Sequence, residues 1–290
     1  MTPAVTVVIV NFNAGQALAD ALGSLDQGLA GIPYEVVVVD NDSRDGSADL
    51  VPERDGLVRL VRNATNQGFG RGVNAGLSFG RAPLALLLNP DCRLTPKAVE
   101  ALRTEIDRHP QCALVGPRLL DPDGSLQASA RGDPTLLTGL FGRTGLLAKL
   151  FPRLPIAQRN LAADAAIKSG APSVEVDWVS GACMLARRGA LDEAGGFDES
   201  YFLYWEDADL CRRLRNAGWH IRYVPSASVV HRVGACSRAA RLLAIREFHR
   251  SAYRYYVTHV VPQWWHPARP VAWAILTLRR VWKQRAAGGE

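Results

Sequence analysis

Cysteine is scarce in this sequence, and the cysteines that it has show no functional spacing. Five cysteines are scattered over 290 residues without a CxxC pair. This pattern indicates neither a disulfide framework nor a zinc site. Free thiols in a reducing compartment fit it best, so we expect a cytoplasmic protein.

Long apolar runs are also missing. The late run at residues 271–278 is far shorter than the ~20 residues that cross a bilayer. The run VTVVIV at residues 5–10 lacks a preceding positive region and a small-residue cleavage site, so we expect a first core strand and no signal peptide. No repeat is visible at solenoid periods. The length fits one catalytic domain with an appendage.

Acidic residues are nearly absent from the last part of the chain. Residues 1–235 carry 24 basic and 26 acidic residues, whereas residues 236–285 carry ten basic residues and only Glu247. Such a segment suits an anionic surface, either a phospholipid face or a diphosphate. No nucleic-acid motif accompanies it, so we expect no nucleic-acid partner.

Short apolar runs alternate with segments of helical spacing through the first half, which predicts an α/β fold with a parallel sheet. In such sheets ligands bind beyond the carboxyl ends of the strands, where Asn11, Asp40 and Asp91 would emerge. The expected strands are residues 5–10, 35–40, 57–61 and 83–89, and the expected helices are residues 15–29, 47–54 and 70–79.

The second half is less regular at first. Residues 121–173 mix Gly, Pro and Leu and predict a long excursion with short helices. Residues 174–196 then predict a strand followed by a helix. A further helix would start at Glu206 or Asp207 and stop at Gly218, and residues 220–231 predict a final strand.

The tail predicts two helices with basic residues. Residues 238–260 place arginines at four-residue steps beside an apolar stripe, and residues 271–285 combine tryptophan with basic residues. Four of the seven tryptophans lie in the last stretch, from residue 264 onward. Two interpretations stay open: helices lying in a membrane interface, and surface helices packed on the core.

Two strand ends carry acids suited to a ligand. Asp40 ends an apolar strand, where its carboxylate can accept from a base N–H or a ribose hydroxyl, although Asp42 or Ser43 nearby can be explained as helix caps. Asp91 follows the turn-forming Pro90. A hard divalent cation that holds a diphosphate needs only one or two protein carboxylates, so Asp91 is a candidate ligand; a plain turn role is the alternative.

Glu206 and Asp207 form the most informative pair. They are adjacent at a predicted helix N-terminus, beside aromatic side chains that can act as a sugar platform. A carboxylate partly screened from water there can have the raised pKa that a general base needs. We expect Asp209 to pair with an arginine one helical turn away. A lone histidine such as His231 is more often a structural residue than a ligand.

Together these motifs resemble those of family 2 glycosyltransferases, and particularly the bacterial rhamnosyltransferase-like branch. The resemblance covers about residues 5–235 and implies a GT-A fold, with a Rossmann-like, mostly parallel central sheet flanked by helices. It implies a catalytic domain over 1–235, with a nucleotide-binding half over about 1–120 and an acceptor-binding half over about 121–235. Residues 236–290 would form a helical appendage. The motifs are VNFN, VVVVDNDSRDGS, NQGFGRGVNAG, LLLNPD, VSGACML and GGFDESYFLYWEDADLCRRLRNAG.

The resemblance also assigns roles to individual residues. Asp207 would be the catalytic base with Glu206 in support, and Asp91 would stand at the metal-binding DxD aspartate, whose first acid is Asn89 here. His231 would complete a site for Mg2+ or Mn2+. The nucleotide would contact Asn11, Asp40, Asn66 and Arg71, and the acceptor would contact Trp178, Tyr204 and Trp205.

The implied reaction inverts the anomeric carbon in one displacement. The donor would be a nucleotide diphosphate sugar such as dTDP-rhamnose, and the acceptor a glycan or polyprenyl-linked glycan in cell-envelope polysaccharide synthesis. The protein would be cytoplasmic or peripheral on the inner face of the cytoplasmic membrane, with residues 238–285 as the contact.

Two alternatives come from other classes. Residues 70–75 (GRGVNA) formally match the GxGxxA motif of a dinucleotide-binding oxidoreductase, but they follow a polar loop after the third predicted strand, while the fingerprint belongs directly after the first. A non-catalytic nucleotide-sugar-binding protein at the membrane is the second alternative, and the intact Glu206-Asp207 pair argues against it.

Overall fold

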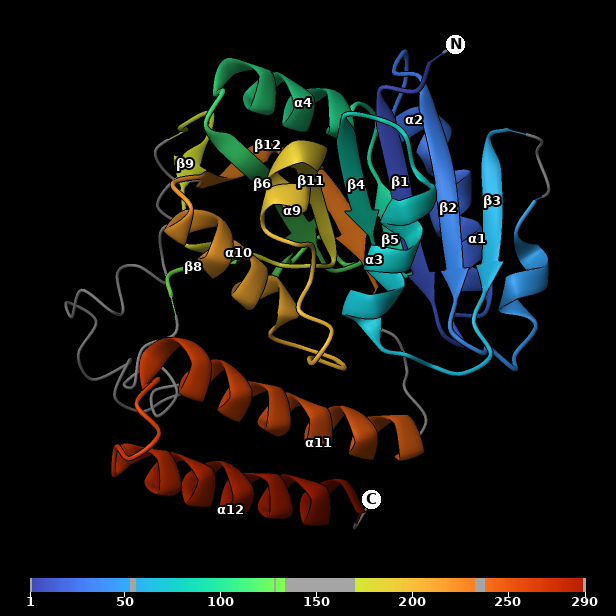
Figure 1. Ribbon diagram of the computed structural model, residues 1–290. Coiled ribbons are helices and arrows are strands. Elements are labelled where there is room, and N and C mark those ends of the chain that lie inside the picture. Colours follow the sequence, from blue (N-terminus) through green and yellow to red (C-terminus); the bar gives the residue numbers. More distant parts are fainter. Residues whose placement is uncertain (1, 53–55, 128, 134–169, 233–237, 289–290) are drawn as a thin grey trace.

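The computed structural model describes residues 2–52, 56–127, 129–133, 170–232 and 238–288 (Figure 1). Within them a mixed sheet of ten strands is flanked by helices, in the order β3-β2-β1-β4-β11-β6-β12-β5 with β7 on β6 and β9 on β12. Its strands are β1 (Val5–Asn11), β2 (Tyr34–Asp40), β3 (Val58–Arg62), β4 (Leu84–Leu88), β5 (Cys92–Leu94), β6 (Cys112–Leu120), β7 (Leu126–Gln127), β9 (Val174–Glu175), β11 (Cys183–Arg187) and β12 (His220–His231). A separate pair joins β8 (Ala130–Arg131) to β10 (Trp178–Val179).

The first half of the sheet is parallel, as expected. β1 pairs in parallel with β2 and β4, and β2 with β3. All seven residues of β1 and all five of β4 are buried, since helices cover both faces of the sheet. Parallel pairing brings the carboxyl ends of β1, β2 and β4 to one edge. Asn11 and Asp40 are register partners there.

The second half of the sheet departs from the parallel pattern. β11 runs antiparallel between β4 and β6, whereas β12 runs parallel to β6. The expected strand and helix over residues 174–196 resolve into three short strands and α9 (Arg188–Glu193). The central strand β6 and the helix α4 (Ala98–Arg108) before it were not predicted from the alternation of strand and helix patterns in the sequence. The α/β architecture is confirmed, with mixed pairing in this half.

The helices correct two expectations in the first half. The helix expected over 15–29 is broken into α1 (Gln16–Gly23) and α2 (Leu25–Gly28). The break falls at Ser24, whose hydroxyl donates to the carbonyl of Ala21 and accepts from the backbone N–H of Leu94. The segment expected as a helix over 47–54 forms only the 3₁₀ turn η1 (Ser47–Leu50) in its described part.

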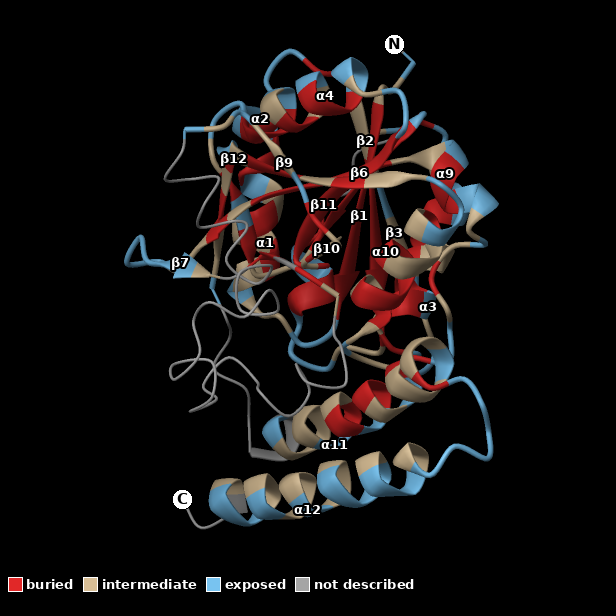
Figure 2. Cartoon of the chain, turned by 90° about the vertical axis from the view of Figure 1, so that its left-hand side faces the viewer, coloured by how far each residue is buried: buried red, intermediate tan, exposed pale blue. Residues whose placement is uncertain are grey.

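Other expected elements agree closely with the structure. α3 (Phe69–Phe79) and α10 (Glu206–Asn216) occupy the predicted ranges, and Gly218 follows α10 with φ +91°. Most of the irregular excursion expected over 121–173 lies outside the described residues. Two apolar cores fill the two faces of the sheet, and the strands form the most buried part of the molecule (Figure 2).

Two long helices follow the sheet. α11 (Arg238–Tyr255) continues as the π-helical turn η2 (Tyr256–Val260), and α12 (Ala268–Gly288) folds back along it. The hairpin lies across the end of the molecule at which β1, β2 and β3 finish (Figure 1). Among the described residues, none of the helices is long and apolar enough to cross a membrane.

Candidate functional site

Asn11 and Asp40 form a buried polar pair at the carboxyl edge of the sheet. The side-chain nitrogen of Asn11 donates to Oδ1 of Asp40 at 2.7 Å and to Oγ of Ser47 at 2.8 Å. Oδ2 of Asp40 accepts from the backbone N–H of Ser43 at 3.1 Å. Asn11 is 0% exposed and Asp40 is 2% exposed. The pair holds the loop after β2 in place, and its contact with a nucleotide stays a prediction.

The loop before α3 carries the other two residues expected at the nucleotide. Oδ1 of Asn66 accepts from the backbone N–H of Gly68 at 2.9 Å, which shapes the turn into the helix. Arg71 is half exposed, and its Nε lies 3.3 Å from Oε2 of Glu199. The side-chain nitrogen of Asn41, one residue after β2, donates to the carbonyl of Gly68 at 3.0 Å. The loops after β2 and β3 are thereby tied together.

Asp91 and His231 meet at the end of β4 and β12. Nε2 of His231 lies 3.3 Å from Oδ1 of Asp91, and their side chains are 15% and 25% exposed. The backbone N–H of Arg232 donates to the carbonyl of Asp91 at 2.9 Å, which fixes the spacing of the two chains. Although it is buried, Oδ1 of Asp91 has no hydrogen-bond partner.

The proton on His231 is set by Gln127. The side-chain nitrogen of Gln127 donates to the His231 carbonyl and to Oδ1 of Asp121, so its oxygen is left to accept. That oxygen lies 2.8 Å from Nδ1 of His231, so Nδ1 must carry the proton. Nε2 of His231 and Oδ1 of Asp91 then face each other, and an imidazole nitrogen beside a carboxylate oxygen is a donor set that suits a divalent cation.

Cys92 lies next to this pair and completes a possible three-ligand group, because its sulfur is within 4.8 Å of the other two ligand atoms. It is a poor ligand. Its Sγ donates to the carbonyl of Ala182 at 3.3 Å, and its side chain is fully buried. Burial first, and then the charges of Cys183 and Asp91, raise the pKa of the thiol well above its usual value. Of these three side chains, Asp91 and His231 are therefore the better candidate cation ligands, and a cation bound to them stays a prediction.

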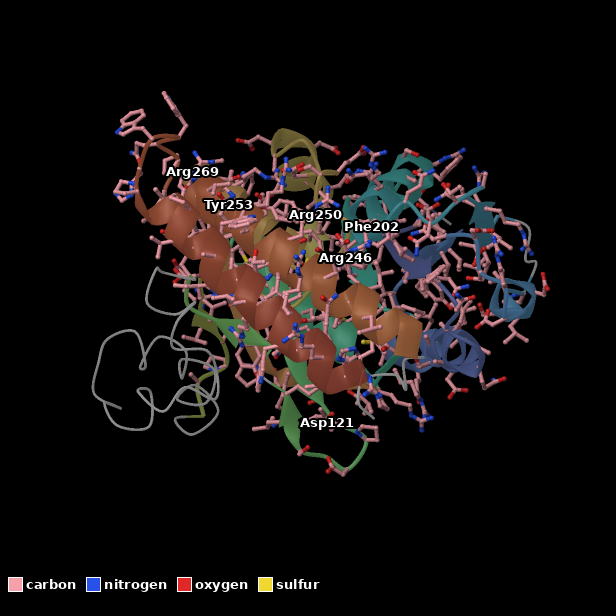
Figure 3. All side chains as sticks on the ribbon, turned by 90° about the horizontal axis from the view of Figure 1, so that it is seen from below. Asp121, Phe202, Arg246, Arg250, Tyr253 and Arg269 are labelled. Atoms are coloured by element: carbon pink, nitrogen blue, oxygen red, sulfur yellow. The ribbon has the colours of Figure 1, made fainter. Side chains whose placement is uncertain are left out.

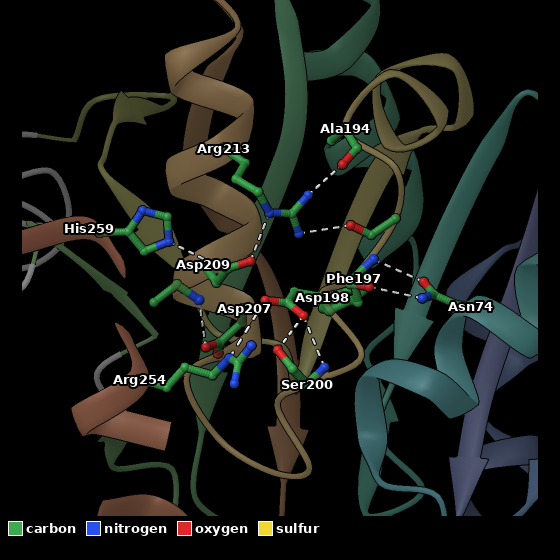
Figure 4. Close-up of polar contacts among 12 residues, drawn as sticks. Asn74, Ala194, Phe197, Asp198, Ser200, Asp207, Asp209, Arg213, Arg254 and His259 are labelled. Atoms are coloured by element: carbon green, nitrogen blue, oxygen red, sulfur yellow. Dashed lines mark hydrogen bonds and ion pairs between the residues drawn. The ribbon is translucent and has the colours of Figure 1, made fainter. Parts of the chain in front are cut away.

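Asp207 is held by backbone N–H groups at the start of α10. Its Oδ2 accepts from the N–H of Gly181 at 2.9 Å, and its Oδ1 accepts from the N–H of Ala208 at 2.8 Å. Figure 4 shows this carboxylate beside the Asp209 network at the N-terminal end of α10. These contacts orient the carboxylate, and its role as a base for a bound hydroxyl stays a prediction.

Glu206 has the opposite environment. It is 6% exposed, and its Oε2 is buried without a hydrogen-bond partner. Burial, followed by the nearby charge of Asp207, raises the pKa of this carboxyl well above its usual value. Burial therefore favours the neutral form of Glu206, and its supporting role beside Asp207 stays a prediction.

Asp209 has the structural role expected from its spacing. Its Oδ2 accepts from Nε of Arg213 at 2.8 Å, and its Oδ1 lies 2.6 Å from Nε2 of His259 (Figure 4). The sequence allowed either Arg212 or Arg213 as its partner. Arg212 instead pairs with Asp133.

The expected acceptor residues lie in a strained aromatic segment before α10. Tyr204 and Trp205 have φ of +67° and +70°, a left-handed conformation that is costly for large side chains and typical of functional segments. Tyr204 is 40% exposed, whereas Trp205 packs with Tyr255 at a ring distance of 5.3 Å. Trp178 joins the same apolar cluster, and its Nε1 donates to the carbonyl of Gly132.

Backbone contacts connect the three acidic positions. Gly181 holds Asp207, while the carbonyl of the next residue, Ala182, accepts from the N–H of Asn89 at 2.8 Å, two residues before Asp91. On the nucleotide side, the N–H of Phe69 donates to the carbonyl of Phe202 at 2.9 Å. The loops that carry the candidate residues are therefore contiguous, and convergence of the three acids on one bound donor stays a prediction.

Gly68 is a site residue that the sequence reading missed. Its φ is +89°, and an added Cβ would lie 2.3 Å from the carbonyl oxygen of Phe202. Only glycine allows the loop after β3 to approach the aromatic segment this closely. The NQG sequence, a turn signal just before a helix, is the feature that could have identified it.

The glycines of α3 explain the apparent dinucleotide motif. An added Cβ at Gly72 would lie 2.7 Å from Cγ1 of Val10 in β1, and one at Gly70 would lie 3.2 Å from Cβ of Phe197. The two glycines of the motif therefore allow α3 to pack closely on its neighbours and do not form a phosphate-binding turn after the first strand. The oxidoreductase alternative loses its only motif.

Comparisons with known proteins identify the family of this chain. The model of the family described as glycosyltransferase like family 2 matches residues 3–257. The N-acetylglucosaminyl-diphospho-decaprenol L-rhamnosyltransferase of Mycobacterium tuberculosis is 34% identical over 288 residues, which cover 95% of this chain and 90% of that protein.

Two solved structures share the fold. The mannosyltransferase PcManGT from Pyrobaculum calidifontis, in complex with GDP-Man and Mn2+, has a TM-score of 0.59 at 17% identity and covers 100% of this chain and 74% of that one. GalNAc-T7 with UDP, GalNAc and Mn2+ has a TM-score of 0.63 at 15% identity and covers 94% of this chain and 51% of that one. The fold is thus GT-A. With the family match over most of its length, the chain belongs to glycosyltransferase family 2 and is a glycosyltransferase.

Proposed function

We propose that this enzyme transfers L-rhamnose from a dTDP-linked donor to a hydroxyl of a lipid-linked glycan that carries a diphosphate. The observation that carries the transfer chemistry is the Asp207 carboxylate, oriented by two backbone N–H groups beside a buried Glu206. The sugar and the acceptor class rest on the name of the mycobacterial relative, which aligns over nearly the whole chain.

The proposed mechanism is a single displacement with inversion. The oxygen of the acceptor hydroxyl attacks the anomeric carbon while Asp207 accepts the proton of that hydroxyl. The nucleotide diphosphate leaves from the opposite face. The raised pKa of Glu206 favours its neutral form, which keeps the negative charge beside Asp207 low. The exposed ring of Tyr204 offers an apolar face for a sugar.

Asp91 and His231 would hold a divalent cation in this scheme, which when bound supplies positive charge to the departing diphosphate. A nitrogen ligand from His231 favours Mn2+ over Mg2+, because Mg2+ prefers oxygen ligands in a near-ideal octahedron. The buried, unpartnered Oδ1 of Asp91 supports this assignment.

Four described cysteines, at positions 92, 112, 183 and 211, are buried free thiols. This supports our proposal that the enzyme works in a reducing compartment, at the cytoplasmic side of the membrane that holds its acceptor.

The Asp207→Asn variant tests the proposed base. Loss of a positioned base typically lowers turnover by ~10² to 10⁴, so kcat for transfer should fall by that factor while the Kd for dTDP-rhamnose stays within a factor of about two. Transfer is measured by release of dTDP and donor binding by calorimetry. Asp107→Asn, at an exposed carboxylate on α4, is the matched control and should behave as wild type.

Near-normal turnover of Asp207→Asn would remove Asp207 from the mechanism. A wild-type protein that binds the donor but neither hydrolyses nor transfers it, with any acceptor or metal, would instead be the non-catalytic nucleotide-sugar-binding protein.

The metal assignment has its own test. Asp91→Asn keeps the shape of the side chain but removes its charge, so the Kd for Mn2+ should rise by about 10-fold or more. Binding is followed by the paramagnetic signal of free Mn2+, without turnover. His231→Gln should weaken Mn2+ similarly. Unchanged Mn2+ binding in both variants would move the cation elsewhere.

A further inference from the structure

The last helix turns an apolar stripe away from the protein. Val271, Ile275, Leu278 and Trp282 follow one another in steps of four, three and four residues, which places them on one face of α12. Their exposed fractions are 57%, 41%, 71% and 68%. The outer edge of α12 is exposed along its length (Figure 2). Such a stripe normally faces a core.

Part of the charge of α12 faces inward. Arg285, near the end of the helix, is exposed, whereas Arg279, Arg280 and Lys283 are partly buried. After burial, their charges are what lower the pKa of His249, a buried residue of the neighbouring helix α11. The polarity of α12 is therefore the reverse of that of an ordinary surface helix, so packing against the protein does not explain its apolar stripe.

Tryptophans extend this surface at the turn before α12. Trp264 and Trp265 are 81% and 67% exposed, and their rings lie 6.0 Å apart. Among the described residues, twelve large apolar side chains are exposed, and seven of them lie between positions 264 and 282. Exposed apolar side chains gathered in this way mark an interaction surface.

Charge indicates which partner covers the surface. From residue 248 to 288 the sequence contains no Asp or Glu, but it contains basic residues along α12 and at its start. A second copy of the chain would bring two such basic helices together, whereas an anionic lipid surface would attract both. Tryptophan with arginine and lysine is also the composition of helices that lie in a membrane interface.

We propose that α12 and the Trp264-Trp265 turn lie flat on an anionic phospholipid bilayer. This inference rests on the proposed function, which places the acceptor in that bilayer. With 21 residues at about 1.5 Å each, α12 would run roughly 30 Å along the surface. The interface is assigned to the outward face of α12, and α11 is the packed helix.

α11 lies between α12 and the aromatic segment before α10, so the proposed membrane surface is close to the candidate acceptor residues. Oγ of Ser251 donates to the carbonyl of Leu203 at 2.9 Å, and Phe248 packs on Tyr204 at a ring distance of 5.8 Å. Only one helix layer, about 8 to 10 Å, therefore separates α12 from the aromatic segment before α10. Seen from below, α11 and α12 lie side by side across this end, with Arg246, Arg250 and Phe202 at one side of α11 (Figure 3).

Vesicle flotation of the full chain tests the proposal. We compare wild type with a Leu278→Glu, Trp282→Glu double variant on phosphatidylcholine vesicles with and without phosphatidylglycerol. Wild type should float with the anionic vesicles and be released at high salt, and the double variant should partition at least about 10-fold more weakly. Phe79→Glu, which changes an exposed apolar residue at the end of α3, is the matched control and should float as wild type.

Binding to vesicles requires no donor or turnover. The membrane proposal can therefore fail while the sugar-transfer proposal holds, and the sugar-transfer proposal can fail while the membrane proposal holds. Equal flotation of wild type and double variant would overturn the proposal. Light scattering that shows a dimer for wild type and a monomer for the double variant would also overturn it, because the stripe would then bind a second copy of the chain. Quenching of wild-type tryptophan by brominated phospholipid is a second measurement that needs no variant. We expect quenching, and its absence would also overturn the proposal.

Discussion

Glu206 and Asp207 are neighbours in the chain but experience opposite surroundings. Asp207 receives two backbone N–H groups, which favour its ionised form, whereas Glu206 is buried with one oxygen unpartnered. Successive side chains of an α-helix are rotated by about 100° about its axis, so Glu206 and Asp207 point in different directions. These opposite surroundings suit the separate roles that we propose, Asp207 as the base and Glu206 as its support.

The Glu206→Gln variant should alter how stability depends on pH. In the folded protein the pKa of Glu206 lies well above its unfolded value of about 4.3, so the native state holds a proton that the unfolded chain releases. The stabilisation that this group contributes is fully present below the unfolded pKa, and it is lost as the pH rises from there toward the folded pKa. Glutamine does not titrate, so the loss should shrink.

Thermal unfolding of wild type and Glu206→Gln between about pH 5 and pH 8 measures this difference. Parallel curves for the two proteins would contradict it. Glu199→Gln, at a half-exposed carboxylate, serves as the control and should follow wild type.

At the scale of elements, the close approach of α3 to the sheet determines where the nucleotide loop sits. Gly72 and Gly76 let the helix rest on Val10 and Val8 of β1, and Gly68 lets the preceding loop touch Phe202. The helix therefore joins the nucleotide edge to the aromatic segment at its N-terminal end. A motif that resembles a phosphate loop in the sequence is a packing surface in the structure.

Gly72→Ala should destabilise the fold by about 1–3 kcal/mol, because the new methyl group would overlap a buried valine of β1. Gly189→Ala, on α9 with nothing within 4 Å of the added Cβ, should be neutral or stabilising by up to about 1 kcal/mol. Urea unfolding measures both. Equal stability of the two variants would mean that α3 can shift away from the sheet at no cost.

At the scale of the whole molecule, the C-terminal hairpin is anchored to α10, the helix that begins with Glu206 and Asp207. His259 of η2 reaches Asp209, which also binds Arg213, and Arg254 lies 3.8 Å from Asp198 (Figure 4). The side chains of His259 and Asp209 are 9% and 2% exposed. A membrane-bound α12 would thus be coupled to the segment that carries the base.

His259→Phe should loosen this anchor. The ring is replaced, but Oδ1 of Asp209 loses a buried hydrogen bond, at a cost of about 1–3 kcal/mol. Amide exchange should accelerate in α11 while β1 and β2 keep their protection. The control is His266→Phe, at an exposed position in the turn before α12. Unchanged exchange in α11 would show that aromatic packing alone holds the hairpin.

Several site residues could be predicted from the sequence because local pattern determines them. Asp40 and Asp91 end apolar strands, and strand ends of a parallel sheet share one edge. The acidic pair at 206 and 207 begins a helix with a clear periodicity and a glycine stop. These features depend on neighbours within a few residues, so the printed sequence contains them.

Other features depended on contacts between distant segments. The lone-pair geometry at His231 requires Gln127, which is 104 residues away in the sequence. The close contact at Gly68 depends on the loop before α3 packing against Phe202, which is far away in the sequence. The left-handed conformation of Tyr204 and Trp205 lies in the same segment as Phe202. The long central strand β6 was missed because its run, interrupted by Gly116 and Pro117, lacks a regular period.

By itself the sequence determined the alternating fold, the family and the order of the acidic positions, since these follow from periodicity and motif. Only the tertiary structure showed how the two tail helices differ: α11 packs on residues before α10, and α12 shows its apolar stripe to the outside, where the membrane interpretation stays a proposal. The physical reason is that an amphipathic pattern specifies a stripe, but which surface meets that stripe depends on how the rest of the chain has packed.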